Sequence, residues 1–299
     1  MKCMNRKYSA LAPWDQSLYA YEFEPFEIIP TKTNFNLIQF LPDPIVFELL
    51  DDLVIMQFEL PNCLIGGDPK KVDCFKYDNK VKKIITTDLY SVEYFNKLYG
   101  YEKLIFGFTP FNPKYTPPHG EKIYDVYYTG HAFNSAIRHA FPVMEKFNHC
   151  FVCADYGNHR NVTYQEKLDL NAQSKISIVH AALFWPPQYR HVASQFEGHG
   201  AFEYIQQTGL APQMKTRIIE AAASKSLIIC LQDSWNLIDS YFEKDKDFIC
   251  WSDINDLEEK IHYVLSHYDE YQPMIESAYN TLMNNFTTAH FFQHYLKNI

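Results

Sequence analysis

Glycine is scarce in this sequence, because only 10 of the 299 residues are glycine, about half the usual share. Neither G-x-G-x-x-G nor G-x-x-x-x-G-K-[ST] occurs, and the only double glycine is Gly66-Gly67. The glycine-rich loops that hold phosphates in nicotinamide dinucleotide enzymes and P-loop NTPases are therefore missing. Both classes are disfavoured.

Long apolar runs are missing as well. No stretch approaches the roughly 18 consecutive apolar residues of a spanning helix, and residues 1–7 lack the apolar core of a signal peptide. Hydrophobic residues make up 47% and charged residues 21% of the chain, as in ordinary globular proteins. We expect a cytoplasmic protein without membrane insertion.

Basic residues are in deficit: 27 Lys and Arg stand against 36 Asp and Glu, which gives a net charge of -9. This field repels phosphate backbones, so a nucleic acid is a possible partner that the charge does not favour. The seven cysteines are an odd number and most lie in apolar runs, which indicates reduced thiols.

Motifs for metal and hydrolase chemistry are also missing. Cys150 and Cys153 form a lone C-x-x-C, and the only D-x-D, at 245–247, falls at a charged helix end. There is no H-E-x-x-H and no G-x-S-x-G. We expect no metal site.

What is present is alternation of β-rich and amphipathic helical runs from about residue 82, typical of a parallel sheet with helices on both faces. The proline-rich run 109–121 predicts an interdomain linker, so we expect domains at 1–118 and 119–299. The periodicity predicts strands over 36–40, 53–58, 83–88, 103–108, 124–129, 150–154, 176–181, 227–231 and 248–251. It predicts helices over 91–99, 134–147, 164–173, 214–224, 234–242, 256–267, 271–285 and 289–296.

Ligands of open parallel sheets bind beyond the carboxyl ends of the strands, so polar residues at the strand exits are the candidate site. A phosphate site and a plain tight turn both explain Gly130-His131. Gln232 and Asp233 follow an apolar strand, although Asp233 is also a natural helix cap. Further candidates at the exits are Asp68, Asp88 and Tyr156.

Six motifs follow one another from residue 64 onward: Ile65-Gly66-Gly67-Asp68-Pro69, Ile84 to Asp88, strand 124–129 with Gly130, His131 and Arg138, Ser174-Lys175-Ile176, Arg217-Ile-Ile-Glu220-Ala-Ala-Ala, and 256–261 with 286–288. In this order they resemble GT-B glycosyltransferases of the family-1 group that includes spore-maturation-type, phage and viral members. The resemblance implies an α/β fold of two Rossmann-like domains facing a cleft. It also implies a reduced N-terminal domain onto which the last helix packs back.

The resemblance further implies an enzyme that moves a sugar from a UDP- or GDP-linked donor to an acceptor hydroxyl without a metal. A carbohydrate, a glycoprotein or a modified base would be the acceptor. A nucleotide-sugar epimerase of the same architecture and a non-catalytic nucleotide-sugar-binding protein are the alternatives.

The same resemblance implies roles for individual residues. Glu220 would accept from ribose hydroxyls, and Arg217 with the Gly130 and His131 amides would face the diphosphate. Lys175 would line the base pocket. Lys225 stands where the family has glycine, so we expect the helix over 214–224 to end without the glycine closure.

Three residues are candidates for catalysis in this scheme. Asp68 is the first candidate for the base that takes the acceptor proton, and Asp88 is the second. Asp68 starting the turn before Pro69 is at least as good an explanation. His131 is the third candidate.

Overall fold

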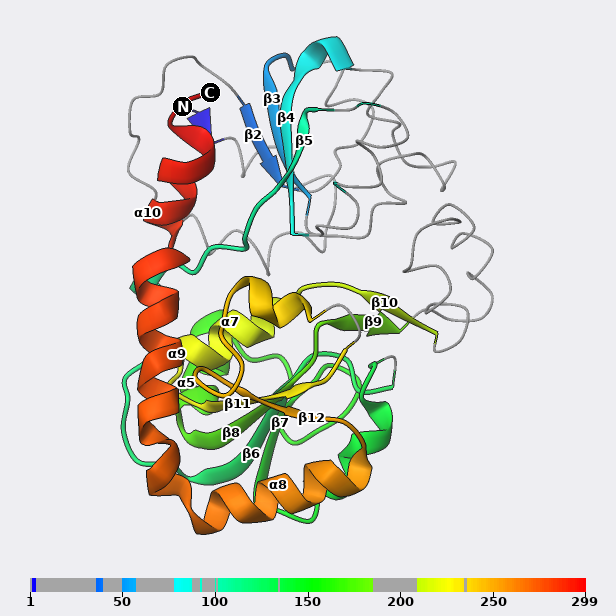
Figure 1. Ribbon diagram of the computed structural model, residues 1–299, viewed down its shortest axis with the longest axis vertical. Helices are drawn as coiled ribbons and strands as arrows, with labels where there is room; N and C mark the ends of the chain where they lie inside the picture. Colours follow the sequence, from blue (N-terminus) through cyan, green and yellow to red (C-terminus); the bar gives the residue numbers. More distant parts are fainter. Residues whose placement is uncertain are drawn as a thin grey trace. The chain divides into compact units, whose positions relative to one another are not determined.

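The structure is a computed structural model, and it describes residues 2–3, 36–39, 50–57, 78–87, 92, 100, 102–133, 135–184, 209–233 and 236–299. The chain divides into two compact units (Figure 1). The first comprises Met1–Pro110, Trp185–Gln213 and Thr288–Ile299, and the second comprises Phe111–Phe184 and Met214–Thr287. Each unit holds a five-stranded parallel sheet, which confirms the predicted α/β fold class.

The sheet of the first unit follows the order of the chain. Its strands are β1 (Lys2–Cys3), β2 (Asn36–Gln39), β3 (Leu53–Gln57), β4 (Val81–Thr86) and β5 (Leu104–Phe106). Residues 53–56 of β3 are fully buried, as expected for a parallel strand that is covered on both faces. The strands predicted at 36–40 and 53–58 are confirmed. Asp68 and Asp88 lie outside the described residues, as does nearly all of the helix predicted at 91–99.

The sheet of the second unit has the order β12-β11-β8-β6-β7. Because the chain leaves β6 toward β7 on one side and returns to β8 on the other, the boundary of β6 and β8 is a topological switch point. The two strands predicted at 124–129 and 227–231 are observed without change. The strands are β6 (Tyr124–Thr129), β7 (His149–Val152), β8 (Ser174–Val179), β11 (Leu227–Leu231) and β12 (Ile249–Trp251).

Helices cover both faces of this second sheet (Figure 1). On one face α5 (Tyr164–Ala172), α7 (Thr216–Ala223) and α9 (Gln272–Asn285) lie side by side. On the other face α4 (Phe141–Met144) and α8 (Ile254–Ser266) enclose the main core, to which the strands contribute alternate residues such as Val126 and Tyr128. No helix among the described residues has the length and hydropathy of a membrane span.

Two predicted helices are wrong. The helix expected at 134–147 is a 3-10 turn, η6 (Arg138–Ala140), followed by the single turn of α4. Pro142 lies at the start of α4, where its missing N–H is tolerated, but in the middle of the predicted helix it would break the ladder. In place of a helix over 234–242 the structure has η8 (Leu237–Ser240), because Asn236 adopts a left-handed conformation with φ of 49°.

The helix end at Lys225 also differs from expectation. α7 closes with the pattern usually made by glycine: the Ser226 N–H donates to the Ala221 carbonyl (3.2 Å) and the Lys225 N–H to the Ala222 carbonyl (3.1 Å). Lys225 itself takes the left-handed conformation, with φ of 48°. The closure is therefore retained with a lysine in the glycine position.

The second unit begins earlier than the boundary predicted at 118/119. The Phe111 N–H donates to the Phe286 carbonyl (2.8 Å), and Phe111 bridges Thr287, so the chain joins the second unit before η5 (Pro113–Tyr115). At the other end, α10 (Thr288–Phe291) and the π-helix η10 (Phe292–Leu296) group with the first unit. The described residues also form η9 (Tyr268–Tyr271) and the short strands β9 (Ala182–Phe184) and β10 (Leu210–Pro212).

Candidate functional site

Four residues meet at the switch point of the second sheet, and we call them the strand-end site: Tyr128, Gly130, His180 and Arg217. Arg217, in the first turn of α7, donates from Nη1 to the Tyr128 hydroxyl (2.6 Å) and to Nε2 of His180 (2.8 Å). Its guanidinium carbon lies 5.0 Å from the centre of the Tyr128 ring, within cation–π range. Three contacts therefore fix one partly exposed guanidinium at the end of β6.

Gly130 makes room for this guanidinium. Its φ is +127°, and a Cβ there would lie 2.5 Å from Nη2 of Arg217. Any other residue would meet both backbone strain and a steric overlap. A tight turn with this positive φ and the room needed by Arg217 both favour glycine at this position.

His180 holds Arg217 as a neutral acceptor. It is 2% exposed, and burial, followed by the positive charges of Arg217 and Lys215, keeps the pKa of its imidazole well below the ordinary value. Since arginine only donates, Nε2 of His180 accepts from Arg217. This contact and the one to the Tyr128 hydroxyl both use Nη1, and together they orient the guanidinium.

The loop after Gly130 is held by Asp155. Its two carboxylate oxygens accept from the backbone N–H groups of Ala132 (3.0 Å) and Phe133 (3.1 Å). Burial raises the pKa of Asp155, but these two N–H groups, its own backbone N–H and His131 together outweigh burial, so the net pKa is lowered. An internal carboxylate thus occupies this pair of amides.

This arrangement changes the phosphate site that we predicted from the sequence. The Gly130 N–H donates to the Val152 carbonyl (3.1 Å) within the sheet, so it is not directed at a ligand. The side chain of His131 is 71% exposed, with Nδ1 3.8 Å from Asp155. Of the predicted phosphate ligands, the Arg217 side chain is the one that neighbouring side chains hold in place at the end of a strand.

Glu220 lies one turn after Arg217 on α7 and does not pair with it. Its Oε1 accepts from the Lys167 Nζ of α5 at 2.5 Å, and the two side chains are 4% and 12% exposed. The pair joins α7 to α5. The ribose role of Glu220 stays a prediction, because a ribose would compete with Lys167 for this carboxylate.

Other candidates from the sequence lie elsewhere. Lys175 is at the amino end of β8, 3.0 Å from Asp125 at the amino end of β6, and thus at the opposite edge of the sheet from Arg217. Tyr156 donates its hydroxyl to Glu145. After β11, Asp233 is buried and Gln232 is exposed.

Tyr128 and His180 belong to the site although the sequence did not single them out, whereas Asp155, which supports the site, begins a donor-rich run at a predicted strand exit. His180 directly follows the last residue of β8, which is the strand-exit signal that selected Gly130. Because Ala181 and Ala182 after it are apolar, the predicted strand runs past it. Tyr128 reads as an alternating core residue, and only its hydroxyl contacts set it apart.

The described residues also bear on metal and thiol chemistry. They contain no group of three or more His, Cys, Asp or Glu side chains able to hold a metal ion. Burial raises the pKa of Cys150 and of Cys153 to about 12, so both thiols stay protonated at neutral pH. The C-x-x-C run at 150–153 is therefore part of the buried core.

A comparison with protein families shows which family the chain belongs to. Residues 136–297, more than half of the chain, match the family described as glycosyl transferase-like. The chain belongs to the glycosyl transferase-like family. The matched region contains the switch-point residues His180 and Arg217, and it ends at residue 297, just after η10.

The solved structures that resemble this family member are GT-B glycosyltransferases with little sequence identity to it. TarM of S. aureus, in complex with fondaparinux, alpha-GlcNAc-glycerol and UDP, has a TM-score of 0.54 and 11% identity over 84% of this chain and 57% of its own. HepE of Anabaena, in complex with UDP-glucose, has a TM-score of 0.53 and 10% identity over 81% of this chain and 70% of its own. Sucrose-phosphate synthase from Thermosynechococcus elongatus has a TM-score of 0.52 and 10% identity, over 81% of this chain and 65% of its own. No curated protein matches the sequence.

Proposed function

We propose that the chain is a nucleotide-sugar-dependent glycosyltransferase whose strand-end site binds the diphosphate of the donor. The observation that carries the proposal is the guanidinium of Arg217, which lies over Gly130 at the switch point and is oriented by Tyr128 and His180. Open α/β sheets bind their ligands at this place. Family membership supplies the reaction class.

The charge at this site suits a departing nucleotide. Arg217 lies in the first turn of α7, and Lys215 is the N-cap of that helix. The amino end of a helix and two cationic side chains stabilise negative charge on phosphate oxygens. When the bond between sugar and diphosphate breaks, this charge grows, so the site acts most strongly on the leaving group.

UDP-sugars are the first donors to test, since HepE was solved with UDP-glucose and TarM with UDP; GDP-sugars remain the second choice. The acceptor hydroxyl would belong to a carbohydrate, a glycoprotein or a modified base. Asp68 and then Asp88 remain the proposed bases, with His131 as the exposed alternative. The spore-maturation or phage grouping also stays a prediction.

The experiment is incubation of the protein with a panel of UDP- and GDP-linked sugars, following nucleotide release and product identity with and without EDTA. We expect release of nucleoside diphosphate that EDTA does not abolish and that Arg217→Lys reduces by about tenfold or more, because lysine lacks the planar fork. Isomerised nucleotide sugar without release would indicate an epimerase. Binding without any turnover would indicate a non-catalytic protein.

A further inference from the structure

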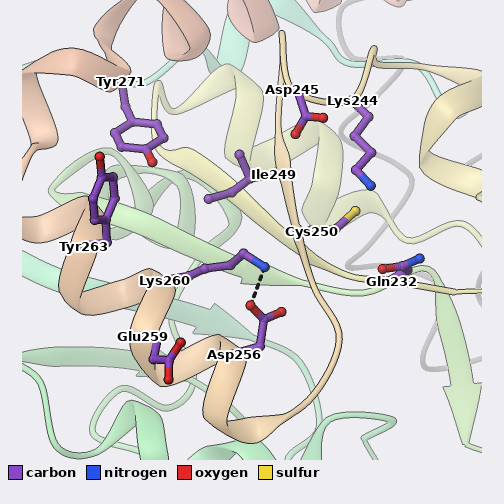
Figure 2. A pocket seen from close by; sticks show the side chains of 10 residues that line it. All are labelled: Gln232, Lys244, Asp245, Ile249, Cys250, Asp256, Glu259, Lys260, Tyr263 and Tyr271. Atoms are coloured by element: carbon purple, nitrogen blue, oxygen red, sulfur yellow. Dashed lines mark hydrogen bonds and ion pairs between the residues drawn. The ribbon is translucent and has the colours of Figure 1, made fainter.

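A cavity lies beside the edge strand β12 of the second unit's sheet (Figure 2). Its volume is about 600 Å³, and its walls come from the end of β11, the turn before β12, β12 itself, α8 and Tyr271. It is set apart from the strand-end site, because β11 lies between β12 and β8. With neighbouring strands about 4.8 Å apart, roughly 10 Å of sheet separates β12 from β8.

Two tyrosines form one side of this cavity. Tyr263 on α8 is 54% exposed, an unusual exposure for so large a ring. One face of the ring stacks on His267, with centroids 4.3 Å apart and an interplanar angle of 19°, so the ring is held in place while half of its surface stays uncovered. Tyr271 also lines the cavity, and Figure 2 shows it next to Tyr263, with the two hydroxyl groups near each other.

Hydrogen-bond donors and acceptors form the other side of the cavity. Lys244 and Asp245, in the turn before β12, and Gln232 after β11 are exposed and line the cavity. Asp245 has a left-handed backbone with φ of 62°, and its N–H donates to the Phe248 carbonyl (2.8 Å). An ammonium, a carboxylate and an amide therefore surround one space, and they supply both donors and acceptors.

The charge pattern decides which class of ligand fits. The lining has two lysines and three carboxylates, and Lys260 is already paired with Asp256. A phosphate or other anion would need an excess of cations, which is missing here. A divalent cation would need grouped carboxylates, and among the described residues no such group exists. A neutral molecule with many hydroxyl groups satisfies mixed donors and acceptors, and its C–H faces pack on tyrosine rings.

We infer that this cavity is a second binding site, separate from the donor site, for a neutral saccharide of about two to four units. Its volume lies within the range of small-molecule sites, about 300 to 1,000 Å³. The inference does not depend on the proposed function, because none of the residues lining the cavity belongs to the strand-end site, and Gln232 is the lining residue that the sequence also named as a strand-exit candidate. In a glycosyltransferase such a site would hold a carbohydrate chain at a distance from the reacting hydroxyl.

The test is saturation-transfer NMR and calorimetry with malto-, cello-, chito- and mannotetraose, each measured in the presence of saturating UDP. The variants are Tyr263→Ala and, as a matched control, Ile123→Ala, since Ile123 is also 54% exposed and lies just before β6. A heparin tetrasaccharide serves as the anionic probe. Thermal denaturation confirms that each variant is folded.

We expect at least one neutral tetrasaccharide to bind, Tyr263→Ala to weaken it by about tenfold or more, and Ile123→Ala to change its affinity by less than about twofold. The inference is overturned if no neutral probe binds, if binding survives Tyr263→Ala, or if the heparin probe binds more tightly than every neutral one. Failure of the proposed function has a different signature, namely loss of UDP binding or turnover with saccharide binding intact.

Discussion

The buried ion pair between Lys167 and Glu220 gives a prediction with a definite size. At 2.5 Å between Nζ and Oε1, and with an effective dielectric constant of about 20, the attraction is about 6 to 7 kcal/mol. Removing two ions from water costs several kcal/mol each, so the net stabilisation by the pair is small. Removing one partner, by contrast, leaves the other charge in a setting that is almost closed to water.

We therefore expect Glu220→Leu and Lys167→Met each to lower the free energy of unfolding by about 3 to 5 kcal/mol. The double variant should return to within about 1 kcal/mol of the wild type, because two apolar side chains then pack between α5 and α7. Urea denaturation followed by far-UV circular dichroism measures all four proteins. The reasoning is refuted if either single variant costs less than about 1 kcal/mol, or if the two losses simply add.

Two further predictions concern local structure in the second unit. Lys225→Gly should be more stable than Lys225→Ala by about 1 kcal/mol in urea denaturation. Both variants lose the ion pair with Glu276, and only glycine adopts φ of 48° without strain. Equal stabilities of the two variants would contradict the strained closure. Asp155→Asn should cost about 1 to 2 kcal/mol at pH 7. Since the folded pKa of Asp155 lies below its ordinary 3.8, the stabilisation by its carboxylate is complete above pH 4 and is lost as the pH falls through the lowered pKa. A difference in stability between the wild type and Asp155→Asn that persists at pH 2 would exclude the capping role.

The sheets were predictable because parallel strands are short apolar runs with polar exits. The runs 124–129 and 227–231 fixed two strands of the second sheet, and the glycine after the first of them pointed to the strand-end site. The resemblance then singled out Arg217. These signals are local in sequence, so they need no knowledge of how the strands are ordered.

The contacts that complete the site depend on strand order and were not predictable. Glu220 and Lys167 are 53 residues apart and meet because α5 and α7 cover the same face of the sheet. Lys175 was placed near the ligand although it opens β8, because a motif that spans a strand does not reveal which end faces the site. The helix predicted over 134–147 is wrong because Pro142 interrupts a run whose apolar periodicity is otherwise helical.

The central claim is that a nucleoside diphosphate binds where Arg217 lies over Gly130. Calorimetric titration of UDP into the wild type, Arg217→Lys, Gly130→Ala and Lys175→Ala tests it most directly, because Lys175 is a comparable cation at the opposite edge of the sheet. The account predicts that the first two variants, confirmed as folded, lose about tenfold or more in UDP affinity, while Lys175→Ala binds as the wild type does. Full affinity in Arg217→Lys and Gly130→Ala, or a loss confined to Lys175→Ala, would contradict it.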